Sequence, residues 1–454
     1  MNRQGSEIVS KQCEKLERFF WFYLILNPIL DIVSGLYIQF VTKGDVYSSA
    51  SVAPITPSLI IRMAVLLVMI GYIFLIRDWR SVKIAIPMGV AWALSVMSEF
   101  LTFGSVSIFI DVQYFARFAY NIAVFLVYCR LMERAGMPRG QVVRRIHRYI
   151  MLSLFLLTVV IVVPYIFGAG HYTYADRFGY RGFRGFYYSG NDITGALMIL
   201  FPIGSCYYLS IDRTEMTGKR HALCALPLAM TLLSMLMIGT KTAFLAVGVS
   251  IAGIALYALV RVIRRDSEPL KRLLCIALLF ILLFAIISGL ATLFNGTSIG
   301  ETLKETVEGF NYAKNESPET LMFSGRLKKL APAWKDYTGG GILTLLFGVG
   351  RGSQVETIEM DLCETLIYYG IFGFIAMLWL YVKEGISFVI RMFRHFTVLE
   401  LGAFLSLGLC VAYLTIAGHV LFTVTSGFYF AVALAYARYI TAGDAPKGHQ
   451  MKNR

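Results

Sequence analysis

Apolar runs that are long enough to cross a membrane recur from one end of this 454-residue chain to the other. Each run is about 17 to 25 residues long, and as a helix it spans a hydrocarbon core of roughly 30 Å. Hydrophobic residues make up 57% of the chain and charged residues only 15%, which excludes a soluble globular domain of ordinary composition. Lipid offers no hydrogen-bond partners, so each span must be helical. The sequence therefore predicts one all-α, polytopic membrane domain over residues 1–454.

The hydropathy pattern predicts about twelve transmembrane helices. We expect them at residues 19–40, 57–76, 84–103, 115–132, 149–168, 193–211, 222–239, 243–260, 273–294, 361–382, 397–416 and 420–437. Asp111 and Arg117 interrupt the outer half of the fourth span, so residues 105–118 could instead form a half-helix at the interface. The two spans within residues 222–260 could also be divided differently.

The basic residues indicate the orientation of these spans. Of the 42 Lys and Arg residues, 28 fall in segments on one side of the twelve-span arrangement, 12 on the other side and two within spans. Because cytoplasmic loops retain Lys and Arg, both termini are expected in the cytoplasm, with a lead at residues 1–18 and a tail at residues 438–454. The cations are dispersed over loop ends, so we expect no nucleic-acid partner.

A predicted outer loop at residues 170–192 mixes aromatic residues and glycines with Arg177, Arg181 and Arg184. The aromatic residues suit an interfacial belt, but the positive charge opposes the usual orientation rule. Guanidinium groups offer forked hydrogen-bond donors that match phosphate oxygens better than Lys does. The loop therefore predicts a phosphate contact by at least one of these arginines.

The longest hydrophilic stretch, residues 295–360, forms a second predicted outer loop between the ninth and tenth helices. It is too long for an idle connector within a compact domain. The apolar residues 342–347 suggest a short helix against the membrane surface. Most charges of this loop suit a solvated surface, but Arg326, Arg351, Glu359 and Asp361 lie closest to the membrane junctions and are the ones we expect to form a site.

Several charges lie within or at the edge of spans, where each costs roughly 2.5 to 3.5 kcal/mol at the bilayer centre unless it finds a partner. Asp31 and Arg62 could form an ion pair with a purely structural role. Arg62, Arg351 and Glu364 are nevertheless retained as further site candidates. Lys241, at the predicted outer turn between the seventh and eighth spans, either snorkels to the interface or completes an outward cationic pocket.

The seven cysteines and six histidines show no close pairing and no metal-ligand spacing. We expect the cysteines to be packing residues, and we expect neither a metal nor another cofactor.

The order and common sidedness of several short motifs resemble the family of O-antigen ligases and O-antigen or capsular polysaccharide polymerases, which are membrane glycosyltransferases. The resemblance covers most of the chain and rests on the large late outer loop and on four motifs, none of which is specific alone. The motifs are Ser-Gly-Asn at 189–191, Gly-Thr-Lys-Thr at 239–242 where many relatives have Ser-Arg, Ser-Gly-Arg at 324–326, and the loop exit at 359–373.

The resemblance implies transfer of a glycan from an undecaprenyl-diphosphate carrier to a sugar hydroxyl on the outer face of a bacterial cell membrane. No nucleotide sugar or metal would take part, and the transfer would invert the anomeric carbon. Carried over by motif, Lys241 and Arg326 would hold the diphosphate, because preorganised cations stabilise the charge that develops on the leaving group. Arg184 and Arg181 are weaker candidates, since the loop aligns poorly there.

In the ligase branch of that family a His stands near the loop exit, whereas this chain has Glu-Met-Asp at 359–361. We expect Glu359 or Asp361 to act as the general base, since a partly buried carboxylate can accept a proton near neutral pH. Asp361 could equally cap the tenth span, and His419 is a more remote alternative base. The absence of the ligase-type His favours a repeat-unit polymerase over a ligase.

Two other classes of protein compete with the polymerase. A transporter or flippase of lipid-linked oligosaccharide has a similar number of helices, but the chain shows no convincing internal repeat. A wide cationic cavity through spans one, two and seven, centred on Asp31 and Arg62, would favour that class. A scaffold protein of a polysaccharide synthase complex is the other competing class.

The expected partners of a polymerase are membrane lipids and lipid-linked oligosaccharide. It would also work beside a flippase and a chain-length regulator.

Overall fold

The computed structural model describes residues 3–41, 56–174, 182–312, 323–354, 357–394, 396–418 and 420–442. These residues are almost entirely helical. Within the described ranges the only sheet is a small hairpin of two antiparallel strands, β1 (His171–Tyr172) and β2 (Phe183–Gly185). The predicted all-α membrane fold is therefore confirmed.

Twelve long helices correspond one to one to the predicted spans. They are α1 (Arg3–Phe40), α2 (Pro57–Leu75), α3 (Trp79–Phe103), α4 (Ile108–Glu133), α5 (Arg139–Ile166), α7 (Gly190–Ser210), α8 (Gly218–Ile238), α9 (Lys241–Ile263), α10 (Glu268–Asn295), α15 (Asp361–Met392), α16 (Val398–Ile416) and α17 (Ser426–Thr441). Eleven of them, all but α17, are long and apolar enough to cross a membrane.

The uncertain boundaries are resolved by these helices. α4 runs without a break from Ile108, so the alternative of an interfacial half-helix over residues 105–118 is wrong. α8 and α9 divide at residues 239–240, as the predicted boundary has it. The amino-terminal lead is helical from Arg3 and continuous with the first span. α17 begins six residues after the predicted start at 420 and has only 16 residues.

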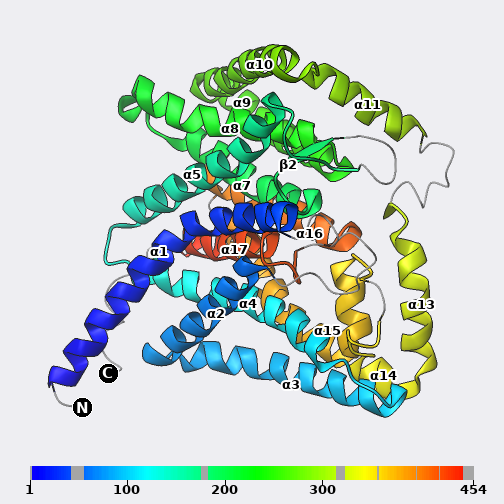
Figure 1. The fold of residues 1–454 in the computed structure, drawn as a ribbon. Coiled ribbons are helices and arrows are strands. Elements are labelled where there is room, and N and C mark those ends of the chain that lie inside the picture. Colours follow the sequence, from blue (N-terminus) through cyan, green and yellow to red (C-terminus); the bar gives the residue numbers. More distant parts are fainter. Residues whose placement is uncertain are drawn as a thin grey trace.

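α17 and α7 form the centre of the bundle (Figure 1). Every residue of α17 from Ser426 to Ala437 is buried, against α4, α7, α15 and α16. Glycines allow the close approach: a Cβ at Gly195 of α7 would lie 2.8 Å from the Ser426 side chain. A helix of about 24 Å is shorter than the hydrocarbon core, but protein surrounds α17 on its sides.

The segment between α10 and α15 folds into three shorter helices, α11 (Ile299–Tyr312), α13 (Arg326–Gly339) and α14 (Gly341–Phe347). Figure 1 shows them at one end of the bundle, and we call this the loop end; α1 begins at the opposite end. The short helix predicted at residues 342–347 is confirmed as α14, which packs against α3 and α15.

α15 is interrupted at Gly370, whose φ of 65° and ψ of −175° are not helical. The interruption frees backbone carbonyls of the preceding turn. Val349 N–H donates to the Ile367 carbonyl (3.0 Å) and Gly350 N–H donates to the Tyr368 carbonyl (3.1 Å). The chain that follows α14 is thereby hydrogen-bonded to the first part of α15, and it holds the exit of the large loop at a fixed place.

Replacing Gly370 by Ala is expected to lower the melting temperature of the purified protein. A Cβ at this position would lie 2.4 Å from the carbonyl carbon and oxygen of Leu346, and the left-handed φ is unfavourable for any residue with a Cβ. Overpacking of this kind costs about 1 to 3 kcal/mol. Gly385→Ala, in the same helix with open space around it, is the matched control. Equal melting temperatures for the two variants would contradict the close docking of α14 on α15.

Candidate functional site

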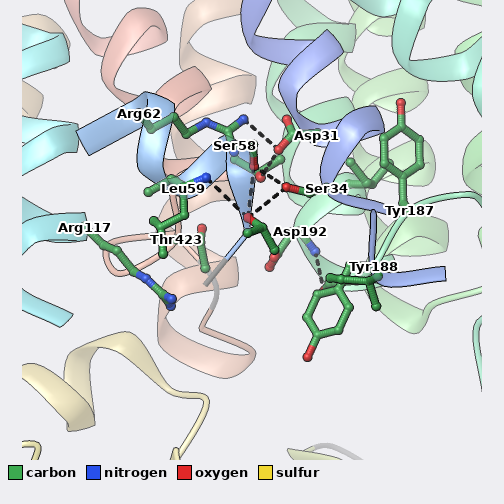
Figure 2. A pocket seen from close by; sticks show the side chains of 16 residues that line it. Asp31, Ser34, Ser58, Leu59, Arg62, Arg117, Tyr187, Tyr188, Asp192 and Thr423 are labelled. Carbon is green, nitrogen blue, oxygen red and sulfur yellow. Dashed lines mark hydrogen bonds and ion pairs between the residues drawn. The ribbon is translucent and has the colours of Figure 1, made fainter. Parts of the chain in front are cut away.

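A polar pocket of about 120 Å³ opens at the loop end. Its walls come from α1, α2 and α4, from the residues that lead into α7, and from the segment between α16 and α17. Two arginines, two aspartates and several hydroxyl groups line it, so its charge is mixed. Figure 2 shows Arg62 with Asp31 on one side of the pocket, and Arg117 reaching in from α4.

Arg62 is held by α1 through a network of buried hydrogen bonds. Its Nη2 lies 2.7 Å from Oδ1 of Asp31, and its Nε donates to Oδ1 of Asn27 at 3.0 Å. The Thr425 hydroxyl donates to the same Asp31 oxygen at 2.6 Å. The predicted Asp31–Arg62 ion pair is therefore confirmed, and it fixes α1, α2 and the start of α17 to one another.

Arg117 is a pocket residue that the sequence analysis did not name as a site candidate. Its Nε is buried, and among the described residues no atom accepts a hydrogen bond from it. Asp192 and Tyr188 line the same pocket and interact electrostatically with Arg117. A charged side chain inside a predicted span was the signal available, since such residues in membrane helices are usually functional.

The start of α7 supplies the Ser-Gly-Asn motif to this pocket. Ser189 caps the helix by accepting a hydrogen bond from Asp192 N–H at 3.2 Å. The Tyr413 hydroxyl of α16 donates to the Asn191 carbonyl at 2.9 Å, and Tyr413 lies within electrostatic reach of both Asp192 and Arg326. The amino end of α7, with its positive dipole, therefore lines the pocket and contacts α16.

Lys241 begins α9 at the same end of the bundle and is exposed. The preceding Thr240 caps α9 by accepting from Ala243 N–H, and its hydroxyl lies 3.2 Å from that of Thr194 in α7. Thr194 is one turn along α7 from the Ser-Gly-Asn motif, and Lys241 directly follows the Thr240 that contacts it. Its predicted place on the loop side of the bundle agrees with the structure.

Glu359 meets two cations of α13. Its Oε1 lies 2.8 Å from Nζ of Lys329, and its Oε2 lies 3.4 Å from Nη2 of Arg326. Arg326 is buried, whereas the Glu359 side chain remains 28% exposed. The backbone of Glu359 has a φ of 64°, and its N–H donates to Oε1 of Glu364 at 2.7 Å. The structure therefore brings together three of the predicted residues, Arg326, Glu359 and Glu364, and adds Lys329.

The Asp361 carboxylate binds the backbone of the segment before α17. It is buried at the start of α15, and its Oδ2 accepts hydrogen bonds from the backbone N–H groups of Val420 (2.8 Å) and Leu421 (2.9 Å). The N-cap residue of α15 is Met360, and Asp361 is the first residue within the helix. Asp361 instead fixes the segment before α17, which carries Thr423 and Thr425 into the pocket.

Arg351 and Glu364 are buried between the loop and the bundle. Arg351 donates to the Gln354 carbonyl (2.6 Å) and to the Thr357 hydroxyl (3.0 Å), and it stacks over the ring of Tyr114. Glu364 accepts a hydrogen bond from the Tyr114 hydroxyl of α4. These contacts hold the loop exit against α4. Arg351 and Glu364 are therefore buried residues that support the loop, and neither side chain is exposed.

The hairpin β1–β2 carries Arg184. Burial and the Arg184 cation together lower the pKa of His171 from its ordinary value. Three other predicted residues, Arg177, Arg181 and His419, lie outside the residues that the structure describes. Within the described ranges no group of three or more His, Cys, Asp and Glu side chains is arranged to hold a metal ion.

The pocket also bears on the transporter alternative. Asp31 and Arg62 do line it, but its helical walls come from the first, second, fourth and sixth spans, and none of its lining residues belongs to the seventh. Its charges are of both signs. This is not the wide cationic cavity on which that alternative depended.

Comparison with known proteins gives one family. A family model described as O-antigen ligase like membrane protein matches residues 13–299 and 297–439, from the first long helix to the last. No curated protein matches the chain.

Proposed function

The chain belongs to the family of O-antigen ligase like membrane proteins, and from this premise we propose that it is a repeat-unit polymerase that uses an undecaprenyl-diphosphate-linked glycan as donor. Membership in this family supports a membrane enzyme that transfers glycans. The identity of the donor and acceptor and the roles of single residues are our proposal.

The observation that carries the proposal is the meeting of Glu359 with Arg326 and Lys329 beside the loop end of the bundle. A diphosphate leaving group needs fixed positive charge, and an acceptor hydroxyl needs a base. Arg326 can form two parallel hydrogen bonds to phosphate oxygens, and it is held in place by burial. Lys241 and Arg184, on neighbouring elements of the loop end, are the further cations proposed for the diphosphate.

In the proposed reaction the acceptor hydroxyl attacks the anomeric carbon of the donor sugar. Its proton passes to the Glu359 carboxylate while the new glycosidic bond forms. The bond between the anomeric carbon and the diphosphate oxygen breaks, and the electron pair leaves with undecaprenyl diphosphate. Arg326, Lys329 and Lys241 stabilise that charge. A single displacement of this kind inverts the anomeric configuration.

Glu359 suits the role of base better than Asp361 does. Lys329 and Arg326 both contact Glu359 through side-chain ion pairs, and a diphosphate could replace the carboxylate as the partner of these two cations. The Asp361 carboxylate is buried and occupied by two backbone N–H groups. We therefore assign Asp361 a positioning role for the segment that forms one wall of the pocket.

The polymerase, rather than the ligase, is favoured because the loop exit has Glu-Met-Asp at 359–361 in the stretch where the ligase branch has a His. The pocket at the amino end of α7, with its hydroxyl groups, tyrosines and Arg117, offers hydrogen-bond partners that a sugar would use. We propose it as part of the binding region for the glycan.

Reconstitution in liposomes tests the proposed function. The substrate is the lipid-linked single repeat, which we expect to accumulate in cells from which the gene is deleted. We expect the purified protein to convert it into a ladder of longer lipid-linked chains and to release one undecaprenyl diphosphate per bond formed. Transfer only to a different lipid acceptor would indicate a ligase. Movement of the substrate across the bilayer without any new glycosidic bond would indicate a transporter and would contradict the proposal.

A further inference from the structure

A second cavity lies at the opposite end of the bundle, away from the proposed active site. It is a groove of about 800 Å³ between α5 and α8, with Tyr207 of α7 on its inner side. The two helices run side by side (Figure 1). Its volume is in the range of about 300 to 1,000 Å³ that is usual for ligand sites. Nothing in the proposed transfer reaction uses it.

The walls of the groove are apolar and open to the surrounding membrane. Leu152 and Phe155 contribute from α5, and Leu223 and Leu226 contribute from α8. Leu223 is 61% exposed and Leu152 is 38% exposed, on helices that are both candidate membrane spans. A slot of this kind between two membrane helices suits a hydrocarbon chain, because lipid tails are as apolar as the side chains that line it.

Three arginines line one end of the groove. Arg144 and Arg148 are one turn apart on α5, and Arg220 lies near the start of α8. Arg144 and Arg220 share a single carboxylate, that of Glu215. Arg148 is exposed and makes no hydrogen bond or ion pair with any described residue. Three guanidinium groups against one carboxylate leave an excess of positive charge at the apolar slot.

His147 lies between these arginines on α5, and it supplies an independent indication of a ligand. Its ring is fully buried and stacks on Tyr207, with 4.0 Å between the ring centres. Nδ1 lies 2.7 Å from the Val143 carbonyl, which can only accept, so Nδ1 carries the hydrogen. Nε2 is then an acceptor; it is buried, it has no hydrogen-bond partner, and its residue lines the groove.

We propose that this groove binds one anionic glycerophospholipid whose headgroup carries a free hydroxyl, as in phosphatidylglycerol. An acyl chain lies between α5 and α8, and the phosphate is bound by Arg148 and its two neighbouring arginines. The headgroup hydroxyl donates to Nε2 of His147. Basic sites between membrane helices bind anionic lipids by this combination of charge and hydrocarbon contact. The bound lipid joins α5 to α8 and stabilises that side of the bundle.

Lipid titrations of the full-length protein in a neutral detergent test this assignment. Three lipids with the same acyl chains are compared by native mass spectrometry and by melting temperature. Phosphatidylglycerol has both the charge and the hydroxyl groups, phosphatidylethanol has the charge alone, and phosphatidylcholine is zwitterionic. We expect affinity to fall in that order.

Two variants test which residues bind the phosphate charge and which binds the headgroup hydroxyl. Arg148→Gln is expected to weaken both anionic lipids about fivefold, the effect of one cation near an anionic lipid. Its matched control is Arg264→Gln, an exposed arginine at the same end of the bundle but outside the groove, which should leave affinity unchanged. His147→Phe keeps the aromatic ring and should remove only the difference between phosphatidylglycerol and phosphatidylethanol.

Equal affinity for all three lipids would overturn the proposal, as would an equal loss in Arg148→Gln and Arg264→Gln. An unchanged preference for phosphatidylglycerol in His147→Phe would overturn the role of the hydroxyl. Because Arg148 is exposed and unpaired among the described residues, Arg148→Gln should fold even if His147→Phe does not.

Discussion

Replacing Glu359 by Gln is expected to lower the rate of glycan transfer by roughly 10²- to 10⁴-fold, which is the usual contribution of a general base. Gln has the same size and can still contact Lys329, but it cannot accept the proton of the attacking hydroxyl. The rate is measured with a labelled lipid-linked repeat in liposomes. Glu359→Asp, with a shorter carboxylate, should retain part of the activity.

Comparing Asp361→Ala with Glu359→Gln distinguishes the carboxylate that acts as the base from the carboxylate that stabilises the fold. This change leaves the buried N–H groups of Val420 and Leu421 without their acceptor, at a cost of about 1 to 3 kcal/mol for each. We therefore expect a lower melting temperature for Asp361→Ala and a nearly unchanged one for Glu359→Gln. If Glu359→Gln makes polymer at the full rate, Glu359 is not the base. Full-length product from both variants would exclude a carboxylate at 359–361 altogether.

Replacing Arg326 by Gln is expected to lower turnover by roughly 10²- to 10³-fold, the loss that follows removal of one preorganised donor to a developing negative charge. The effect should fall on kcat, because the charge on the diphosphate oxygen increases as the bond to the sugar breaks. Arg326→Lys keeps the charge but loses the forked geometry, so it should be intermediate.

Lys328→Gln is the matched control for Arg326→Gln. Lys328 lies on the same helix, two residues further on, and is exposed. It removes the same charge from α13 without touching Glu359. Activity equal to that of the unchanged protein is expected. An equal loss in both variants would mean that the general charge of the loop matters, and that Arg326 has no specific contact with the diphosphate.

The fold could be predicted from the sequence because hydropathy is a local property. Twelve apolar segments gave twelve helices, and the charge interruptions in α4 did not break it. The predicted start of the last helix at residue 420 was wrong, because Asp361, about 60 positions earlier, holds residues 420 and 421 in a turn. No local pattern carries information on such a contact.

The site was only partly predictable for the same reason. The motifs at 324–326 and 359–361 placed Arg326 and Glu359 in one predicted loop, and the structure shows an ion pair between them. Lys329 joins them because α13 begins at Arg326, which puts residues 326 and 329 on one helix face. Arg351 was expected near the site, but Asp111, 240 positions away, holds its backbone N–H in a buried contact.

The large loop is attached to the bundle by two kinds of bond that respond differently to the medium. Backbone hydrogen bonds tie residues 349 and 350 to α15 beside Gly370, and ionic strength scarcely affects such bonds. By contrast, α13 meets the loop exit through the partly exposed carboxylate of Glu359. Dissolved salt weakens that attachment, since mobile ions screen exposed charges. A rise in salt concentration should therefore loosen the contact between α13 and the loop exit, while the hydrogen-bonded junction at Gly370 stays intact.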